Sequence, residues 1–145
     1  RLPIRTVLGL RDIIDGPERH MFTYFFEATL PHWKVNPPTT CVQADLGILG
    51  LGTNGHVAFH EPGIQTEFFS GCLPLTNKTL EVLDLEKGTW GQTFGLGAFL
   101  KTKSILMIVR GAKKESVVER MMAADKELPA AALLKHSDFT LITDF

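Results

Sequence analysis

Apolar residues follow two patterns along this chain: short continuous runs, and positions three or four residues apart. The clearest run is Ser104–Val109, which predicts a strand buried in a parallel sheet. Gly111 follows it, and apolar residues then recur at helical spacing from about residue 113 to residue 124. The apolar stripe of this predicted helix consists of Val117, Val118, Met121 and Met122. Strand, glycine and helix together predict a βα unit, and the N-terminus of such a helix is a natural anion site.

The first forty residues predict a strand, a helix and a long loop. The apolar residues within Ile4–Leu10 favour a strand, and Asp15 stands before Gly16-Pro17 where a helix N-cap is expected. The next thirteen or so residues predict a helix that packs on the sheet. Its apolar stripe, which we expect in the core, consists of Met21, Phe22, Phe25, Phe26 and Leu30. The prolines within Pro31–Thr40 predict a surface loop.

The rest of the chain continues this alternation of strands and helices. We expect a buried strand at Leu46–Leu51, a strand at Cys72–Thr76, a helix at Leu128–His136 and a final strand at Phe139–Thr143. The segment Thr79–Leu85 fits a strand and a helix equally well. Together these elements predict an α/β fold with a mostly parallel, Rossmann-like sheet and flanking helices. Residues 1–145 have the length of a single α/β domain.

Composition and charge exclude several classes of protein. Hydrophobic residues make up 44% and charged residues 21%, as in ordinary globular domains, and the net charge of −1 gives no basic field for nucleic acid. No apolar run is long enough to cross a bilayer, so we expect no membrane partner. Cys41 and Cys72 form no CxxC pair, which favours a reduced, cytoplasmic compartment over a structural disulfide. The five histidines lack metal-ligand spacing, and we expect neither a metal nor a cofactor.

The stretch Asp45–Gly63, DLGILGLGTNGHVAFHEPG, concentrates the candidate chemistry. A glycine-rich turn follows the apolar run, and glycines there let the backbone approach a ligand where parallel sheets place their ligands. His56 titrates near neutral pH and can accept and return a proton, and a carboxylate such as Glu61 is the best group to orient it. Spacing alone also fits a plain turn histidine and a solvated acid.

The exact residues of this stretch are more specific than the spacing of its glycines and polar groups. Leu49–Gly63 resembles the signature LGxGxDGHIAFNEPG of the glucosamine-6-phosphate deaminase/isomerase family. The related 6-phosphogluconolactonases share the GxGxDGH part but typically lack the Glu-Pro step, so Glu61-Pro62 favours the amino-sugar branch. Trp90–Leu100 also resembles a family segment, ALTVGVGTLL. The resemblance implies an enzyme that converts glucosamine 6-phosphate or galactosamine 6-phosphate to the ketose 6-phosphate and ammonia, with a small sugar phosphate as its partner.

The resemblance also implies roles for individual residues of the signature. His56 is expected to open the sugar ring, with Glu61 as its carboxylate partner and Asn54 as a third catalytic residue. Gly52 and Gly55 are expected to bind the substrate. Asn54 stands where typical deaminases have aspartate; it can orient an imidazole but cannot neutralise an imidazolium. Family members associated with galactosamine 6-phosphate often carry asparagine here.

Two further residues are candidates for substrate binding. Lys113 and Lys114 fall at the start of the predicted helix after Gly111, where the helix dipole disfavours cations. Two solvated lysines are the plain explanation, but family members use a lysine near this glycine to contact the substrate phosphate, and the resemblance assigns that role to Lys114. Thr93 is expected to cap the short helix that follows it, and contact with the substrate is the alternative.

Other features depart from the family pattern. His60 stands where asparagine is usual, and the residues alone assign it no consequence. The family's amino-terminal third, with its SGGTP-like phosphate loop and the aspartate that serves as general base, has no counterpart here, and residue 1 is arginine. We therefore expect the carboxy-terminal portion of a longer enzyme, with an incomplete amino-sugar-phosphate isomerase fold and little or no activity in isolation.

Two other functions remain open. The first is a 6-phosphogluconolactonase-type hydrolase, against which Glu61-Pro62 argues. The second is a non-catalytic sugar-phosphate sensor domain, although a retained His56 and Glu61 exceed what a sensor needs. The residues leave open whether the chain forms a homo-oligomer.

Overall fold

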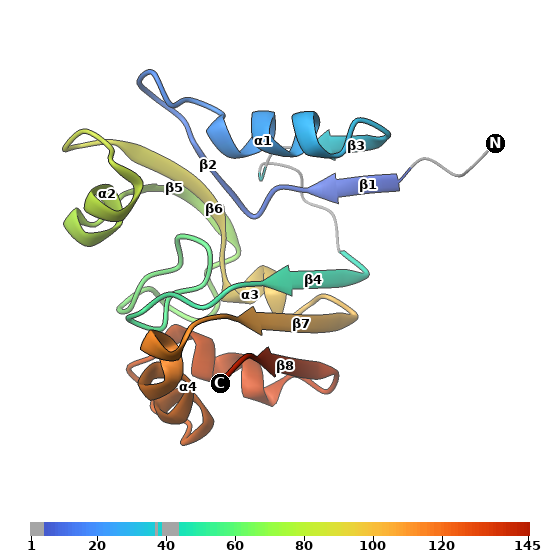
Figure 1. The fold of residues 1–145 in the computed structure, drawn as a ribbon, viewed down its shortest axis with the longest axis vertical. Coiled ribbons are helices and arrows are strands. Elements are labelled where there is room, and N and C mark those ends of the chain that lie inside the picture. The colour runs from blue at the N-terminus through green and yellow to red at the C-terminus, as the bar shows by residue number, and fades with distance from the viewer. Residues whose placement is uncertain (1–4, 37, 39–43) are drawn as a thin grey trace. The chain divides into compact units, whose positions relative to one another are not determined.

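The computed structural model describes residues 5–36, 38 and 44–145 (Figure 1). The chain forms two compact units. Unit 1 consists of Arg1–Cys41 and Ser70–Thr93, and unit 2 consists of Val42–Phe69 and Phe94–Phe145.

Unit 2 is built on a parallel sheet with strand order β4-β7-β8. β4 covers Leu46–Leu49, β7 covers Ser104–Val109 and β8 covers Phe139–Thr143. In register, Leu49 pairs with Met107 of β7, so the carboxyl ends of β4 and β7 lie at the same edge of the sheet. β7 has the bounds predicted for it, and the parallel pairing confirms the predicted sheet type.

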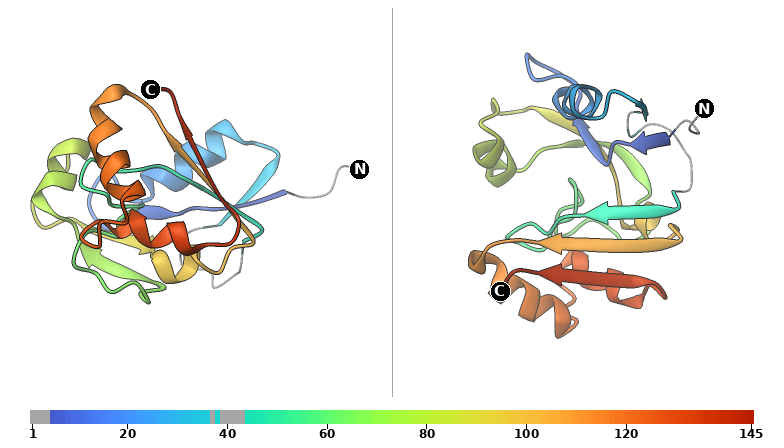
Figure 2. Two further views of the ribbon diagram at one scale, coloured as in Figure 1. Left: turned by 90° about the horizontal axis from the view of Figure 1, so that it is seen from below. Right: turned by 45° about the vertical axis from the view of Figure 1, so that its right-hand side comes forward.

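Helical segments cover one face of this sheet, as two further views show (Figure 2). They are α3 (Leu96–Phe99), the 3₁₀ turn η1 (Ala112–Lys114), α4 (Glu115–Met122) and the 3₁₀ helix η2 (Pro129–Lys135). The core beneath them is apolar and contains Leu49, Val57, Phe59, Leu96, Ile105, Met107, Val109, Met121 and Leu133. The opposite face corrects a prediction: β4 is not buried on both sides, because Leu46 and Ile48 are 51% and 56% exposed. Met122 of the predicted apolar stripe is likewise exposed, because α4 turns it away from the sheet.

Unit 1 contains the remaining strands and helices. β1 (Arg5–Leu8) pairs in parallel with β3 (Trp33–Asn36), and β2 (Arg11–Ile13) pairs antiparallel with β6 (Trp90–Phe94). β5 (Ser70–Pro74) lies on the other side of β6. The helices are α1 (Met21–Thr29) and α2 (Asn77–Leu83). The ambiguous segment is therefore a helix, capped by Thr76, whose hydroxyl accepts a hydrogen bond from the N–H of Thr79 at 3.3 Å.

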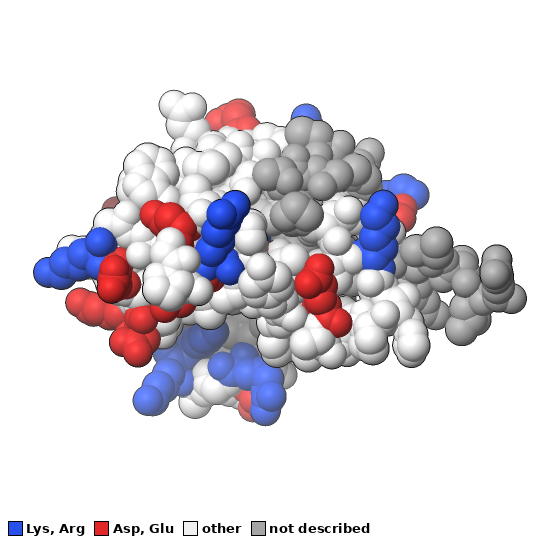
Figure 3. All heavy atoms as spheres, turned by 90° about the horizontal axis from the view of Figure 1, so that it is seen from above, with Lys and Arg blue, Asp and Glu red and all other residues white. Residues whose placement is uncertain are grey.

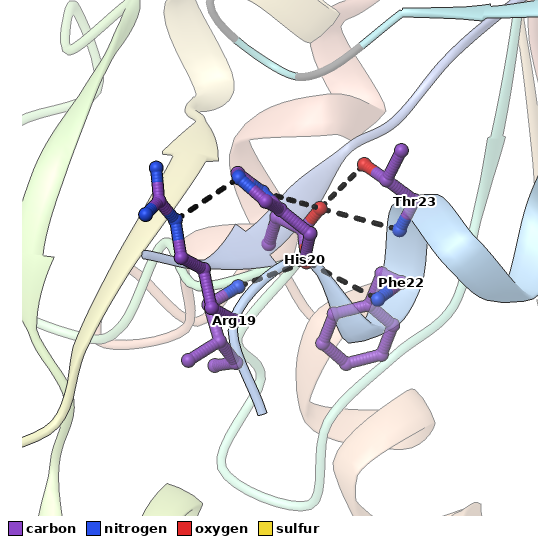
Figure 4. A network of polar contacts seen from close by, with 6 residues as sticks. Arg19, His20, Phe22 and Thr23 are labelled. Atoms are coloured by element: carbon purple, nitrogen blue, oxygen red, sulfur yellow. Dashed lines mark hydrogen bonds and ion pairs between the residues drawn. The ribbon is translucent and has the colours of Figure 1, made fainter. Parts of the chain in front are cut away.

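The first helix starts differently from its prediction. The buried carboxylate of Asp12 accepts hydrogen bonds from the N–H groups of Phe22 and Thr23, at 3.1 and 3.2 Å, and one from the Thr23 hydroxyl (Figure 4). Asp12 thus satisfies the first N–H groups of α1 from a neighbouring strand. The prediction that Asp15 caps this helix is wrong, because its carboxylate accepts from the N–H of Trp90 instead.

Two more predictions for unit 1 are wrong. No residue of α1 is buried, and Phe25 is 59% exposed, because the helix packs beside β2 and β3 mainly through half-buried side chains such as Phe22. The surface loop expected at Pro31–Thr40 contains β3, which forms because it finds a partner in β1. Cys72 is an exposed free thiol, whereas Cys41 lies outside the described residues.

The surface carries charges of both signs. Figure 3 shows Lys and Arg side chains interspersed with Asp and Glu on one face, in keeping with the net charge of −1. Among the described residues, no helix combines the length and apolar character needed to cross a membrane.

Candidate active site

The glycine-rich turn begins where β4 ends and is closed by its own backbone. The N–H of Gly52 donates to the carbonyl of His56 at 2.9 Å, and the N–H of Gly55 donates to the carbonyl of Gly52 at 3.0 Å. The ring of His56 folds back over Gly52, and a Cβ atom at that position would overlap three atoms of the imidazole. Gly52 is therefore required for the position of the His56 ring.

His56, Asn54 and Glu61 form one chain of polar contacts. Nδ1 of His56 lies 2.6 Å from Oδ1 of Asn54, and Nδ2 of Asn54 donates to Oε2 of Glu61 at 2.8 Å. The N–H of His56 also lies 3.3 Å from Oδ1 of Asn54, which forms an Asx turn. The Glu61 carboxylate lies 3.6 Å from Nδ1 of His56, at ion-pair distance rather than in a hydrogen bond.

The direction of these hydrogen bonds fixes the protonation of the histidine. An ionised carboxylate can only accept, so the Asn54 amide nitrogen must face Glu61 and its oxygen must face His56. Nδ1 of His56 must then carry a proton, and in the neutral ring Nε2 carries the lone pair. This modifies the expected pairing, because Asn54 is the direct partner of His56 and Glu61 acts through it. The spacing of Asn54, two residues before His56, was the signal for this Asx turn.

A tight turn brings Glu61 back to His56. Val57 and His60 exchange backbone hydrogen bonds, at 3.3 and 2.9 Å, and Ala58 between them has a left-handed φ of 56°. Val57 and Phe59 are buried, with exposed fractions of 0% and 1%. These two apolar anchors hold the turn, while the side chains of His56 and Glu61 retain 24% and 12% exposure.

Lys114 reaches the same turn from the segment that follows β7, the strand paired with β4. It ends η1, the 3₁₀ turn after β7, and its ammonium Nζ donates to the carbonyl of Leu51 at 2.6 Å. Leu51 directly precedes Gly52, so the ammonium lies beside the glycine-rich turn. Lys114 is partly buried, and no carboxylate of the described residues lies within ion-pair distance of it. Both lysines precede α4 rather than lying in its first turn, which instead holds Glu115.

The other predicted substrate-binding residues have different surroundings. Gly55 is buried, and its carbonyl accepts from the N–H of Ala130, which ties the turn to η2. Thr93 is not the cap of α3, because it lies within β6 and the cap position is Gly95. Its hydroxyl donates to the carbonyl of Leu10 at 3.3 Å, and Thr93 belongs to unit 1, whereas His56, Asn54 and Glu61 belong to unit 2. Among the described residues, no three His, Cys, Asp or Glu side chains cluster as metal ligands would.

Comparisons with known proteins agree on the family. The family model described as glucosamine-6-phosphate isomerases/6-phosphogluconolactonase matches residues 17–142. A glucosamine-6-phosphate deaminase of Lysinibacillus sphaericus is 35% identical over 108 residues, which make up 69% of this chain and 49% of that protein. A glucosamine-6-phosphate deaminase of Bacillus cereus (strain G9842) is 35% identical over 108 residues, 69% of this chain and 41% of that protein. The matched region thus spans about half of the length of these curated relatives or less.

Solved structures share the fold. A monomeric glucosamine-6-phosphate deaminase superimposes with a TM-score of 0.76 at 22% identity, over 95% of this chain and 71% of that one. The 6-phosphogluconolactonase of Trypanosoma brucei superimposes with a TM-score of 0.69 at 16% identity, over 94% of this chain and 70% of that one. At these identities the likeness concerns the fold alone.

Proposed function

The chain belongs to the family of glucosamine-6-phosphate isomerases and 6-phosphogluconolactonases, and we propose that it acts as an amino-sugar-phosphate deaminase. The reaction converts glucosamine 6-phosphate or galactosamine 6-phosphate to the ketose 6-phosphate and ammonia. The observation that carries this proposal is the His56–Asn54–Glu61 chain of contacts, at 2.6 and 2.8 Å, at the carboxyl end of β4.

His56 performs the ring opening in this proposal. Its Nε2 lone pair takes the proton of the anomeric hydroxyl while the bond between the anomeric carbon and the ring oxygen breaks. The resulting imidazolium returns its proton to the ring oxygen, so the histidine ends the step unchanged. The Asn54 oxygen accepts from Nδ1 throughout, and the Glu61 carboxylate, 3.6 Å from Nδ1, balances the transient positive charge.

Lys114 binds the phosphate group in this proposal. Its partly buried ammonium has no counter-charge among the described carboxylates and lies at the carbonyl of Leu51, next to the glycine-rich turn. A phosphate dianion supplies the missing negative charge. Gly52 and Gly55 contribute through close backbone approach rather than N–H donation, because both N–H groups serve the turn. Thr93 is proposed as a further substrate contact on the resemblance alone.

The base that moves the proton from C2 to C1 lies outside these 145 residues in this proposal. The aspartate that serves the family in this role has no counterpart identified in the chain, so the chain by itself is expected to release little or no ammonia. A protein extended to the length of the curated relatives is expected to be active.

Ammonia release from both amino-sugar phosphates, measured for this chain and for the extended protein, tests the proposal. Activity in the extended protein alone is expected, and efficient turnover by the 145-residue chain would contradict the external base. Asn54→Asp in the extended protein tests specificity: if Asn54 marks galactosamine 6-phosphate, the variant shifts preference toward glucosamine 6-phosphate. An unchanged ratio of kcat/KM for the two epimers would remove that role from Asn54.

A lactonase is the second candidate, because the matching family model also covers 6-phosphogluconolactonases. Hydrolysis of a phosphosugar lactone by the extended protein, without ammonia release, would favour it. Binding of a sugar phosphate by the extended protein without either reaction would instead favour a sensor.

A further inference from the structure

His60 is fully buried between the turn and the start of α3. Its Nδ1 accepts a hydrogen bond from the N–H of Leu96 at 3.2 Å, so the neutral ring carries its proton on Nε2. Nε2 is buried without a hydrogen-bond partner among the described residues. Burial lowers the pKa of His60, and the nearby backbone of Ile64 raises this pKa by a smaller amount. His60 is therefore a neutral imidazole that accepts a backbone N–H, and its tautomer differs from that of His56.

The surroundings of His60 leave little room for it to move. A Cβ atom at Gly95 would lie 2.9 Å from Nδ1 of His60 and would overlap the carbonyl oxygen of Phe68. That carbonyl accepts from the N–H of Gly97 at 3.0 Å, and the ring of Phe68 lies 6.0 Å from the imidazole. The imidazole is thus held between the loop at Phe68 and the first turn of α3.

We propose that His60 is a positioning residue for the reaction proposed above. His60 directly precedes Glu61, and its backbone is hydrogen-bonded to the backbone of Val57, the residue after His56. The bond to Leu96 therefore fixes the backbone of Glu61 relative to the rest of unit 2. Glu61 in turn holds Asn54, and Asn54 holds the proton on Nδ1 of His56. His60 thereby selects the tautomer in which Nε2 of His56 is the base.

The tautomer of each histidine can be read directly from two-bond ¹H–¹⁵N correlation spectra of the 145-residue chain. In the wild type we expect the proton on Nε2 of His60 and on Nδ1 of His56. His60→Leu removes the acceptor for Leu96, and we expect His56 to relax toward the tautomer mixture of a solvated imidazole. His60→Asn places an oxygen where Nδ1 stands, and we expect it to preserve the wild-type tautomer of His56.

His136 supplies a matched control. Its Nδ1 accepts from the N–H of Asp138 at 3.1 Å and its Nε2 lies 2.9 Å from the carbonyl of Thr102, at the amino end of β8. His136→Leu therefore removes an imidazole that likewise accepts a backbone N–H, although at a half-buried position, and should leave the His56 signals unchanged. If His60→Leu fails to fold, His60→Gln replaces it, because its longer side chain carries the oxygen past the Leu96 N–H.

An unchanged Nδ1–H tautomer of His56 in a folded His60→Leu or His60→Gln variant would overturn the proposal. In the extended protein we expect kcat to fall about 10- to 100-fold in His60→Leu with KM little changed, and to recover in His60→Asn. The spectra need no substrate, so the two proposals fail separately. A tautomer change without ammonia release in the extended protein would contradict the proposed function alone, and ammonia release with an insensitive His56 would contradict the role of His60 alone.

Discussion

Two histidine–carboxylate arrangements in this chain have nearly the same separation and different surroundings. In unit 1, Nδ1 of His20 lies 3.7 Å from Asp12; in unit 2, Nδ1 of His56 lies 3.6 Å from Glu61. The Asp12 carboxylate accepts from the N–H of Ile13 and, in α1, from two backbone N–H groups and a hydroxyl. Arg19 donates to Nε2 of His20 at 3.1 Å.

Glu61 instead holds the amide of Asn54, which holds the proton of His56. The first carboxylate starts a helix, whereas the second orients an imidazole. The distance between a histidine and a carboxylate thus says little about function until the other bonds of the carboxylate are known. Substitutions in the two regions should separate them accordingly.

The largest expected effect is that of His56→Ala in the protein extended to the length of its relatives. Removing the residue that we propose opens the ring should lower kcat for ammonia release by about 10²- to 10⁴-fold, as expected for the loss of a general acid–base group. The free energy of unfolding should change little, because the ring is partly exposed. Steady-state kinetics and urea unfolding measure the two quantities, and full activity of this variant would remove His56 from the mechanism.

Asp12→Ala, in contrast, should lower the free energy of unfolding. It removes the acceptor for the first N–H groups of α1 and for the Thr23 hydroxyl, so we expect a loss of about 2 kcal/mol in the free energy of unfolding. Asp15→Ala is the control, since Asp15 accepts a single N–H at an exposed position. Urea unfolding of the 145-residue chain measures both. An equal or larger loss in Asp15→Ala would contradict the assignment of Asp12 as the cap.

A smaller effect is expected on the free energy of unfolding when the pH is lowered, and it comes from His60. Burial lowers the pKa of His60 in the folded chain, so below about pH 6.5 the unfolded chain binds more protons at this residue. The stability that the wild type has over His60→Asn should therefore fall as the pH drops, by at most about 1.4 kcal/mol per pH unit, until the folded pKa is passed. Urea unfolding of both proteins at about pH 7.5 and about pH 5.5 measures it. A difference that is constant, or that grows in acid, would refute a neutral His60.

The smallest expected effect belongs to His20→Ala. Because Asp12 keeps its bonds to α1 without His20, we expect less than about 0.5 kcal/mol of lost stability. We also expect ammonia release by the extended protein to stay within about twofold of the wild type. A loss of activity comparable with that of His56→Ala would show that the arrangement in unit 1 is functional as well.

Elements with a strong local pattern were predictable. The apolar run of β7 and the glycine after it specify a strand and a turn from neighbouring residues alone, and the structure has the predicted bounds for this strand. The signature from Leu49 to Gly63 likewise placed His56 and Glu61 at one site. β3 was missed because its strand character comes from pairing with β1, which a local pattern of Pro, Lys and Asn does not reveal.

By itself the sequence determined the α/β class and the family, and it named the residues for which catalytic roles are proposed, because these depend on local patterns and on the identity of side chains. Only the tertiary structure decided which hydrogen bonds those side chains form. It placed Asn54 between His56 and Glu61, turned Lys114 onto the carbonyl of Leu51, and joined His60 to the N–H of Leu96. Each of these bonds joins groups whose distance and direction are set by turns and packing, so residue types and spacing along the chain do not specify them.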